Sequence, residues 1–136
     1  MRRAAALLAL LLLPGCGSSK SESRVERDLL RGVAQIRDTH DAKKLQTELR
    51  RTLASLRGDP ASTEAERRAR ALGSLGFAAT LGGLRSQIDF YENDNGNIEA
   101  ATRDALRADR LRARGARLLR AAGGALGLRI GPLGGR

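Results

Sequence analysis

The sequence contains few of the residues on which metal sites and disulfide-bonded domains depend. Its 136 residues include one cysteine, one histidine, three aromatic residues and no tryptophan. The single cysteine, Cys16, has no partner for a disulfide within the chain. One cysteine and one histidine, His40, are also too few to complete a zinc site. These absences exclude a disulfide framework and a zinc-binding module.

The sequence also lacks catalytic motifs. No glycine-rich loop is followed by Lys and then Ser or Thr, as a phosphate-binding loop would require. The segment "LGSLG", Leu72 to Gly76, is not a nucleophile elbow because leucine replaces its first glycine. Asp89 and Glu92 form a carboxylate pair at i,i+3 spacing, which is common near exposed helix ends. We therefore expect a non-enzymatic protein with no metal and no other cofactor.

The scarcity of aromatic residues constrains the fold. The core has to be built mainly from Leu, Ala, Ile and Val, because only 2% of the residues are aromatic. Such a composition favours closely packed helices over a sheet. With 41% hydrophobic residues, the chain can bury the core of one domain. The sequence predicts an all-α fold, a small three- or four-helix bundle.

The positive charge is concentrated near the C-terminus. The formal net charge is +10. Cys16 to Thr102 contains 14 basic and 13 acidic residues, whereas Arg103 to Arg136 contains nine arginines and only two acidic residues. No aromatic residues alternate with these arginines to stack on bases, so we expect no nucleic-acid partner.

The first 13 residues have the layout of a secretory signal. In "MRRAAALLALLLL", two arginines precede an apolar run from Ala4 to Leu13. A helix of that length spans only ~15 Å, about half of the ~30 Å hydrocarbon core of a bilayer. This run is therefore too short for a conventional membrane span.

The only cysteine lies at the end of this signal. "LPGC" resembles the lipobox of bacterial lipoproteins, with Leu13, Gly15 and Cys16 at the matching positions. Pro14 departs from the family pattern, which usually has a small or β-branched residue there. The resemblance covers Met1 to about Ser19. It implies that Cys16 receives a diacylglyceryl group, that a peptidase removes residues 1–15, and that two acyl chains hold the protein at a membrane.

Ordinary secretion is the alternative interpretation, with cleavage nearby, for example after Gly17, and a free protein as the product. No Ala-x-Ala cleavage site directly follows the apolar run to support it. In the lipoprotein interpretation, the polar residues after Cys16 form a flexible tether with a reach of roughly 15 Å. We then expect an extracytoplasmic protein anchored to the cell membrane, or to the outer membrane if the organism has one, which Gly17 would permit.

Two segments with apolar residues at helical spacing follow, and "DTHD", Asp38 to Asp41, separates them. Thr39 or Asp41 can cap the second segment. The two segments therefore predict either a kinked helix or a helical hairpin. We expect His40, within this break, to be a polar surface or boundary residue.

The segment "RGDPAST" predicts the end of the second helix and the start of a third. Gly58 is suited to a left-handed C-cap, and Pro60 prevents the helix from continuing. Thr63 and Glu66 have the spacing of a capping box.

The third helix is expected to be long and to occupy the centre of the bundle. One stripe of the helix is large, formed by Phe77, Leu81, Leu84, Ile88 and Tyr91. The neighbouring stripe is small, formed by Ala69, Gly73, Gly76, Thr80 and Gly83. The small stripe predicts close approach of a neighbouring helix. A partner-binding or membrane-dipping hairpin is the alternative.

The segment "YENDNGNIEAAT" has a glycine and an isoleucine where a calcium-binding EF-hand loop has them. Its first and twelfth residues are Tyr91 and Thr102, so the acidic ligands that hold Ca²⁺ are missing. We predict a turn instead, with a helix C-cap through Asn95 and Gly96 and with Asn97 as the next N-cap.

The last helix is predicted to be basic and amphipathic, from Ile98 to about Ala122. Its apolar face is formed by Ile98, Ala101, Ala105, Ala108, Leu111, Gly115, Leu118 and Ala122. Its basic face is formed by Arg103, Arg107, Arg110, Arg114 and Arg117. One interpretation of this basic face is a solvated surface, on which ion pairs such as Glu99 with Arg103 reduce the repulsion between arginines. The other is a contact surface for anionic lipid headgroups or an anionic envelope polymer.

These observations divide the chain into a signal peptide (1–15), a lipidated cysteine with its tether (16–23), a helical bundle (24–122) and a Gly-rich tail (123–136), which we expect to be irregular or frayed. The function that they predict is that of a membrane-anchored lipoprotein with a structural or interaction role at the cell envelope. A small-ligand-binding module with a groove beside the third helix is one alternative, and a secreted protein without lipid is another. The sequence does not identify a protein partner.

Overall fold

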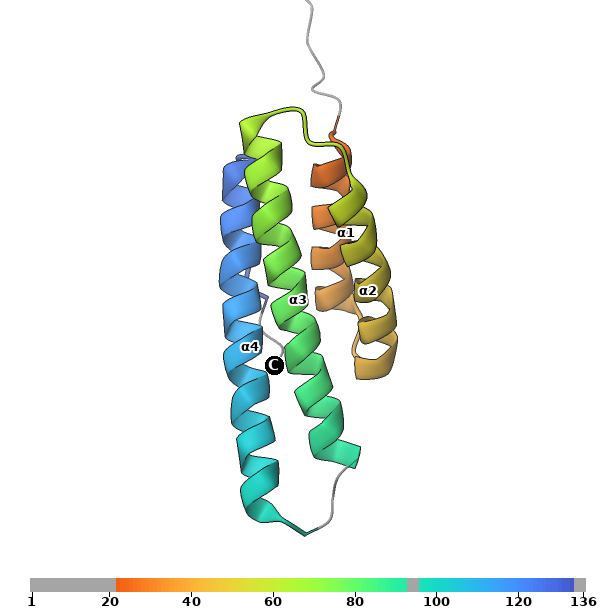
Figure 1. The fold of residues 1–136 in the computed structure, drawn as a ribbon, viewed down its shortest axis with the longest axis vertical. Helices are drawn as coiled ribbons and strands as arrows, with labels where there is room; N and C mark the ends of the chain where they lie inside the picture. The colour runs from red at the N-terminus through yellow and green to blue at the C-terminus, as the bar shows by residue number, and fades with distance from the viewer. Residues whose placement is uncertain (1–21, 93–95, 134–136) are drawn as a thin grey trace, which may run out of the picture.

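The computed structural model describes residues 22–92 and 96–133. They form an antiparallel bundle of four helices, labelled in Figure 1: α1 (Arg24–Asp38), α2 (Ala42–Gly58), α3 (Glu64–Glu92) and α4 (Ile98–Ala125). No strand occurs in these two ranges. The predicted all-α bundle is confirmed, with four helices.

The predicted break before α2 is a turn, so α1 and α2 form a hairpin. Asp41 is the N-cap of α2, and its carboxylate accepts a hydrogen bond from the backbone N–H of Lys44 at 2.7 Å. Thr39 ends α1 instead. Its hydroxyl donates to the Glu48 carboxylate of α2 at 3.1 Å, which ties the two helices together beside the turn.

The capping box at the start of α3 is also confirmed. The Thr63 hydroxyl accepts from the backbone N–H of Glu66, and the Glu66 carboxylate accepts from the backbone N–H of Thr63, both at 3.1 Å. Hydrogen bonds from the backbone N–H of Thr63 and from Ser62 lower the pKa of Glu66. The prediction for Gly58 is wrong. Its φ is not positive, because α2 passes into an extended residue, Asp59, without a left-handed turn.

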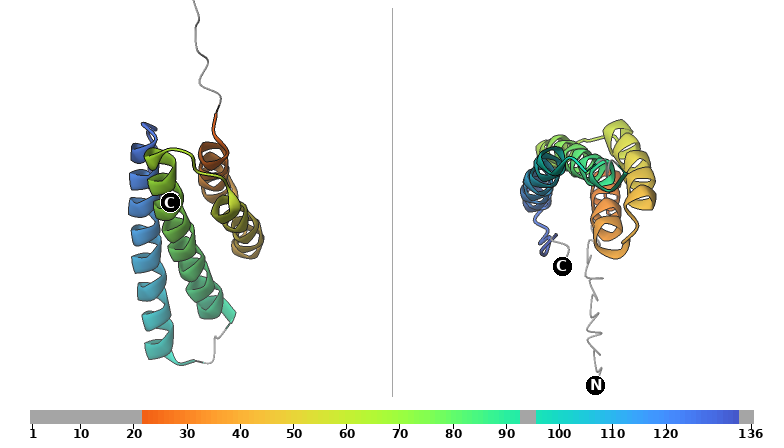
Figure 2. Two further views of the ribbon diagram at one scale, coloured as in Figure 1. Left: turned by 45° about the horizontal axis from the view of Figure 1, so that its top comes forward. Right: turned by 90° about the horizontal axis from the view of Figure 1, so that it is seen from below.

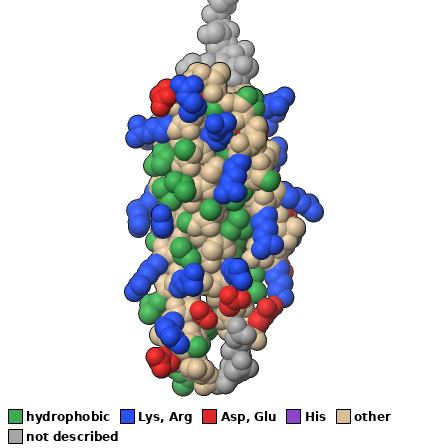
Figure 3. All heavy atoms as spheres, in the orientation of Figure 1, with side chains coloured by type: hydrophobic (Ala, Val, Ile, Leu, Met, Phe, Trp, Pro, Cys, Tyr) green, Lys and Arg blue, Asp and Glu red, His purple; other side chains and the backbone are tan. Residues whose placement is uncertain are grey.

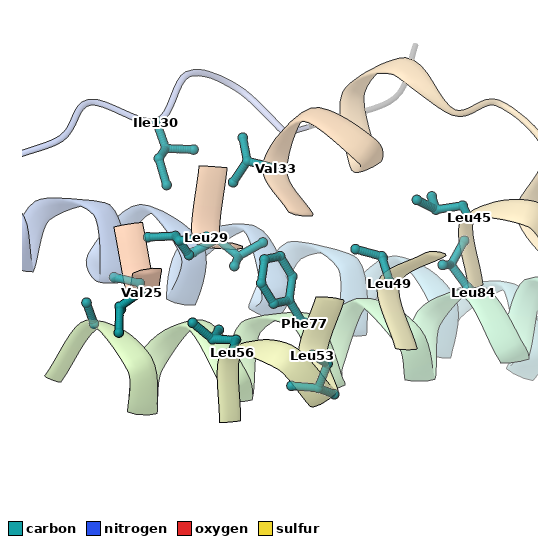
Figure 4. Close-up of a cluster of buried hydrophobic side chains, with 13 residues drawn as sticks. Val25, Leu29, Val33, Leu45, Leu49, Leu53, Leu56, Phe77, Leu84 and Ile130 are labelled. Carbon is teal, nitrogen blue, oxygen red and sulfur yellow. The ribbon is translucent and has the colours of Figure 1, made fainter. Parts of the chain in front are cut away.

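The core lies between the two hairpins (Figure 4). The ring of Phe77 on α3 is completely buried at its centre, among leucines that α1 and α2 contribute. The fully buried side chains around it include Leu29 of α1 and Leu49 and Leu56 of α2. Leu and Val side chains of this kind each contribute about 1.5–3 kcal/mol on burial, so this cluster holds the hairpins together.

The small stripe of α3 allows α4 to pack closely, as predicted. All of its residues are buried: Ala69, Gly73, Gly76, Thr80 and Gly83. A β carbon added to Gly76 would lie 2.8 Å from Cγ of Leu119, and one added to Gly83 would lie 3.0 Å from the carbonyl oxygen of Ala108. A side chain at either position would push α4 away from α3.

The α3–α4 hairpin extends beyond the α1–α2 hairpin at the end opposite the N-terminus (Figures 1 and 2). α3 and α4 have 29 and 28 residues, against 15 and 17 in α1 and α2. Two predictions of burial fail for this reason. Tyr91 is 69% exposed and Ile98 is 81% exposed, because they belong to the end of the α3–α4 hairpin that extends beyond α1 and α2.

The C-terminal segment folds back onto the bundle. α4 continues to Ala125, three residues past the predicted boundary, and a Schellman motif then ends it. Gly127 adopts φ 74°, and the backbone N–H of Leu128 donates to the carbonyl of Gly123 at 2.9 Å. Residues 126–133 have no regular secondary structure, yet Ile130 is only 9% exposed and packs on Gly123.

Candidate functional site

The residues of the signal and lipobox, Leu13, Gly15 and Cys16, lie outside the described residues. The described chain begins at Glu22, and Ser23 caps α1 by accepting a hydrogen bond from the backbone N–H of Glu26 at 3.2 Å. Seven residues, 17–23, therefore separate Cys16 from the first residue of the folded domain.

The basic residues predicted on the last helix form a continuous exposed row on α4. We call it the arginine row, and its members are Arg103, Arg107, Arg110, Arg114 and Arg117. The row covers about 21 Å along the helix at 1.5 Å per residue. Lys and Arg side chains project along the α4 edge of the molecule in Figure 3, and others are scattered over the face formed by the remaining helices.

The arginine row has little internal charge compensation. Within residues 22–92 and 96–133, none of its five guanidinium groups lies within 4.0 Å of a carboxylate oxygen. The expected pairs, such as Glu99 with Arg103, are therefore not formed. The guanidinium groups are left available to an external anion.

The opposite face of α4 is held against α3, which fixes the direction of the row. The buried residues of this face are Ala108, Gly115, Leu119, Ala122 and Gly123. Leu119, rather than the predicted Leu118, reaches the core. Leu119 is buried in place of Leu118 because its side chain fills the space that Gly76 of α3 leaves open.

Arg112 differs from the arginine row. It is half-buried, and its guanidinium Nη2 donates a hydrogen bond to Oε1 of Gln87 on α3. Its side-chain stem lies against Gly83, where an added β carbon would be 3.1 Å from Arg112 Cγ. The glycine therefore makes room for an arginine between two packed helices.

Arg112 and Gln87 line a cavity of about 490 Å³ in the middle of the bundle. Its floor is apolar, with Leu84 of α3 and Ala116 and Leu119 of α4. The end of α1, the turn after it and the start of α2 line one side, from Ile36 to Leu45, and the returning C-terminal segment lines another with Pro132 and Leu133. This volume lies within the range of small-molecule sites in proteins.

The rim of the cavity carries positive charge. Arg37, which is exposed in the last turn of α1, and Arg112 both contribute to its wall, and the exposed His40 of the α1–α2 turn lines it as well. No Asp or Glu lines the cavity in the described part of the chain. The sequence did predict His40 as a surface or boundary residue, and its exposure confirms this.

Sequence reasoning missed the role of Arg112, although a signal was present. Arg112 lies four residues after Ala108 and three before Gly115, and both are on the apolar face of the helix. An arginine at that spacing belongs to the buried face by helical periodicity. No comparable signal exists for Pro132 and Leu133, because the folding back of the tail is a tertiary contact.

The structure places the remaining polar candidates near the turn between α3 and α4. Glu92 pairs with Lys43 of α2, with 2.5 Å between Oε1 and Nζ, and this contact raises the pKa of Lys43. Gly96 has φ 71°, and Asn97 caps α4 as predicted, whereas Asn95 lies outside the described residues. No cluster of three or more potential metal ligands is present in the described ranges.

None of the four described helices has both the length and the apolar character that crossing a membrane requires. Comparison of the chain with protein-family models, curated proteins and solved structures gives no significant match.

Proposed function

We propose that the protein is a bacterial lipoprotein with a non-enzymatic interaction role at the cell envelope. In this proposal, residues 1–15 are removed and Cys16 carries a diacylglyceryl group. The helical bundle is thereby held at the extracytoplasmic face of the membrane. The arginine row then contacts anionic lipid headgroups of the same membrane.

The observation that carries the anchor is the order of features at the N-terminus. An apolar run ends at Leu13, the lipobox-like "LPGC" follows, and the Ser23 cap of α1 comes seven residues after Cys16. Seven residues extend at most about 24 Å. A diacylated Cys16 would therefore keep the bundle at the membrane surface.

The position of the N-terminus on the bundle sets the orientation that the arginine row requires. The chain enters α1 at one end of the bundle, and the α3–α4 turn lies at the other (Figure 1). α4 is about 42 Å long at 1.5 Å per residue. If the bundle stood upright on its tether, Arg103 would lie several Debye lengths from the membrane. The row can reach the headgroups only if the bundle lies on its side, which the tether permits.

Membrane fractionation of cells tests the anchor. We expect the wild-type protein, and a Ser19→Ala variant as matched control, to sediment with membranes and to be released by detergent but not by high salt. Cys16→Ser should be released by salt or appear in the soluble fraction. A soluble wild-type protein would contradict the proposal and would support the secreted alternative.

A further inference from the structure

We infer that the cavity beside Arg112 binds a single-chain amphiphilic anion, that is, one alkyl chain with a carboxylate or phosphate head. This ligand class is distinct from the membrane surface that the arginine row would contact. The inference does not depend on lipidation of Cys16.

The volume of the cavity and the apolar part of its wall suit an alkyl chain. Its volume is about 490 Å³, and Leu84, Ala116 and Leu119 form its floor. Water in contact with such side chains is displaced favourably by an alkyl chain. A compact polar anion such as inorganic phosphate would leave this surface wet.

The charges on the wall favour a negative head group. The guanidinium-bearing residues Arg37 of α1 and Arg112 of α4 both line the cavity. No described Asp or Glu in the wall neutralises them. An alkyl cation would therefore be repelled, and a neutral alcohol would leave the guanidinium groups without a counter-charge.

Arg112 is the residue that would fix the head group. The only hydrogen bond found for it among the described residues goes to Gln87, and a guanidinium has five N–H donors. Contact with Gln87 and with the α3 backbone at Gly83 holds the side chain between the helices. A positioned guanidinium can then donate two parallel hydrogen bonds to a carboxylate or phosphate.

The experiment is isothermal titration calorimetry on the full chain carrying Cys16→Ser, which cannot be lipidated and is purified without detergent. The probes are dodecanoate and dodecyl phosphate, each below its micelle concentration, with dodecyltrimethylammonium as the cationic control. We expect at least one of the two anions to bind with a stoichiometry of one. The cation should bind at least about tenfold more weakly.

Variants separate the cavity from general adsorption. Arg112→Gln should weaken anion binding at least about tenfold, because a charged hydrogen-bond donor is lost. Arg112→Lys should weaken it less. Ala116→Leu should block the cavity, and circular dichroism would confirm that this variant folds. Arg120→Gln is the matched control, since it removes the same charge from an exposed position on the same helix, and it should bind as the parent does.

Three results would overturn the inference. The first is the absence of binding by both anions. The second is equal binding of the cation. The third is anion binding that Arg112→Gln and Arg120→Gln weaken equally, since this would indicate a response to net charge alone.

Discussion

The ring of Phe77 on α3 occupies the space that a side chain on Gly32 of α1 would need. A β carbon built on Gly32 would overlap both Cζ and Cε1 of the ring. Phe77 is completely buried, so its ring cannot turn out toward solvent without leaving the core. The only aromatic side chain in the core therefore depends on one glycine in a neighbouring helix.

Gly32→Ala should destabilise the protein by about 1–3 kcal/mol through overpacking, although alanine is the better helix former. Gly124→Ala on α4 is the matched control, because nothing lies within 4 Å of its β-carbon position, and it should stabilise by up to about 1 kcal/mol. Urea unfolding measures both. In a Phe77→Leu background, Gly32→Ala should lower the free energy of unfolding by less than it does in the wild type. An equal loss in the two backgrounds would show that the ring is not the obstacle.

Gly115→Ala should push α4 away from α3 and destabilise the bundle. Truncation of the neighbouring Thr80 side chain should not restore the lost stability in full. The added β carbon would overlap the Thr80 hydroxyl and would lie 2.9 Å from the carbonyl oxygen of Gly76. Thr80→Ala removes the first obstacle and leaves the second, which is backbone. In thermal unfolding the double variant should therefore remain less stable than Thr80→Ala alone. Full recovery would mean that the hydroxyl is the only close contact.

Two carboxyl groups, Asp28 of α1 and Asp59 after α2, are buried close together. One oxygen of each has no hydrogen-bond partner in the described structure. Burial, and secondly the neighbouring charge of Asp28, raise the pKa of Asp59 above the ordinary value of 3.8. A raised pKa means that the folded state binds a proton more readily than the unfolded state. The stabilising contribution of this proton is fully present below pH 3.8 and is lost as pH rises through the raised pKa.

Asp28→Asn should therefore stabilise the protein at pH 7 by about 1 kcal/mol, since it removes one charge and its amide can donate to Asp59. The ion pair of Asp28 with the half-exposed Arg31 at 3.2 Å is lost as well, but a pair of that kind contributes less. The gain should shrink as pH falls toward 3. Asp109→Asn, at an exposed position of α4, should change the stability by less than about 0.5 kcal/mol at both pH values. Urea unfolding across this pH range is the measurement. Parallel pH profiles of wild type and Asp28→Asn would contradict the assignment.

The arginine row predicts binding to anionic vesicles that depends on position as well as charge. Replacing Arg103, Arg107 and Arg110 by Gln should weaken binding of the Cys16→Ser chain to phosphatidylglycerol vesicles by about 100-fold, at about 1 kcal/mol per residue. Vesicle sedimentation at low and high salt is the measurement, and binding to neutral phosphatidylcholine should be negligible.

The control for this prediction removes the same charge from another helix. Arg50, Arg51 and Arg57 are exposed on α2, which makes no contact with α4 in the described structure. Their replacement by Gln should have a much smaller effect. Equal loss in the two triple variants would indicate attraction by net charge and would contradict a specific membrane-facing surface.

Local signals in the sequence predicted the starts of α2, α3 and α4 and the close contact between α3 and α4. Asp41, Thr63 and Asn97 each have an oxygen that can cap a helix start, and this property is visible without tertiary structure. The glycines of α3 recur at helical spacing, so their common face was predictable too.

Which residues a distant part of the chain covers was not predictable in the same way. Tyr91 and Ile98 follow the apolar pattern, but their burial depends on whether α1 and α2 extend far enough to cover them, and these helices do not. Ile130 shows the converse. It belongs to a Gly-rich segment that has no periodicity, and the turn at Gly127 returns it to the core.

The regular spacing of the exposed arginines made the different position of Arg112, which lines the cavity, easy to overlook in the sequence. The regular spacing of the arginine row indicated an exposed basic face, and Arg112 was counted with the other arginines of the segment. Its relation to Ala108 and Gly115 places it on the opposite side of α4, beside Gln87. Charge and helical phase have to be considered together for every residue of such a helix.

Lipidation of Cys16 is the central claim, and the intact mass of the natively expressed protein tests it most directly. The protein would be extracted from membranes with detergent and compared with a Cys16→Ser variant. The predicted mass corresponds to a chain that begins at Cys16 and carries a diacylglyceryl group, and the variant should lack this species. An unmodified chain in the soluble fraction, whether it retains residues 1–15 or begins after Gly17, would contradict the claim.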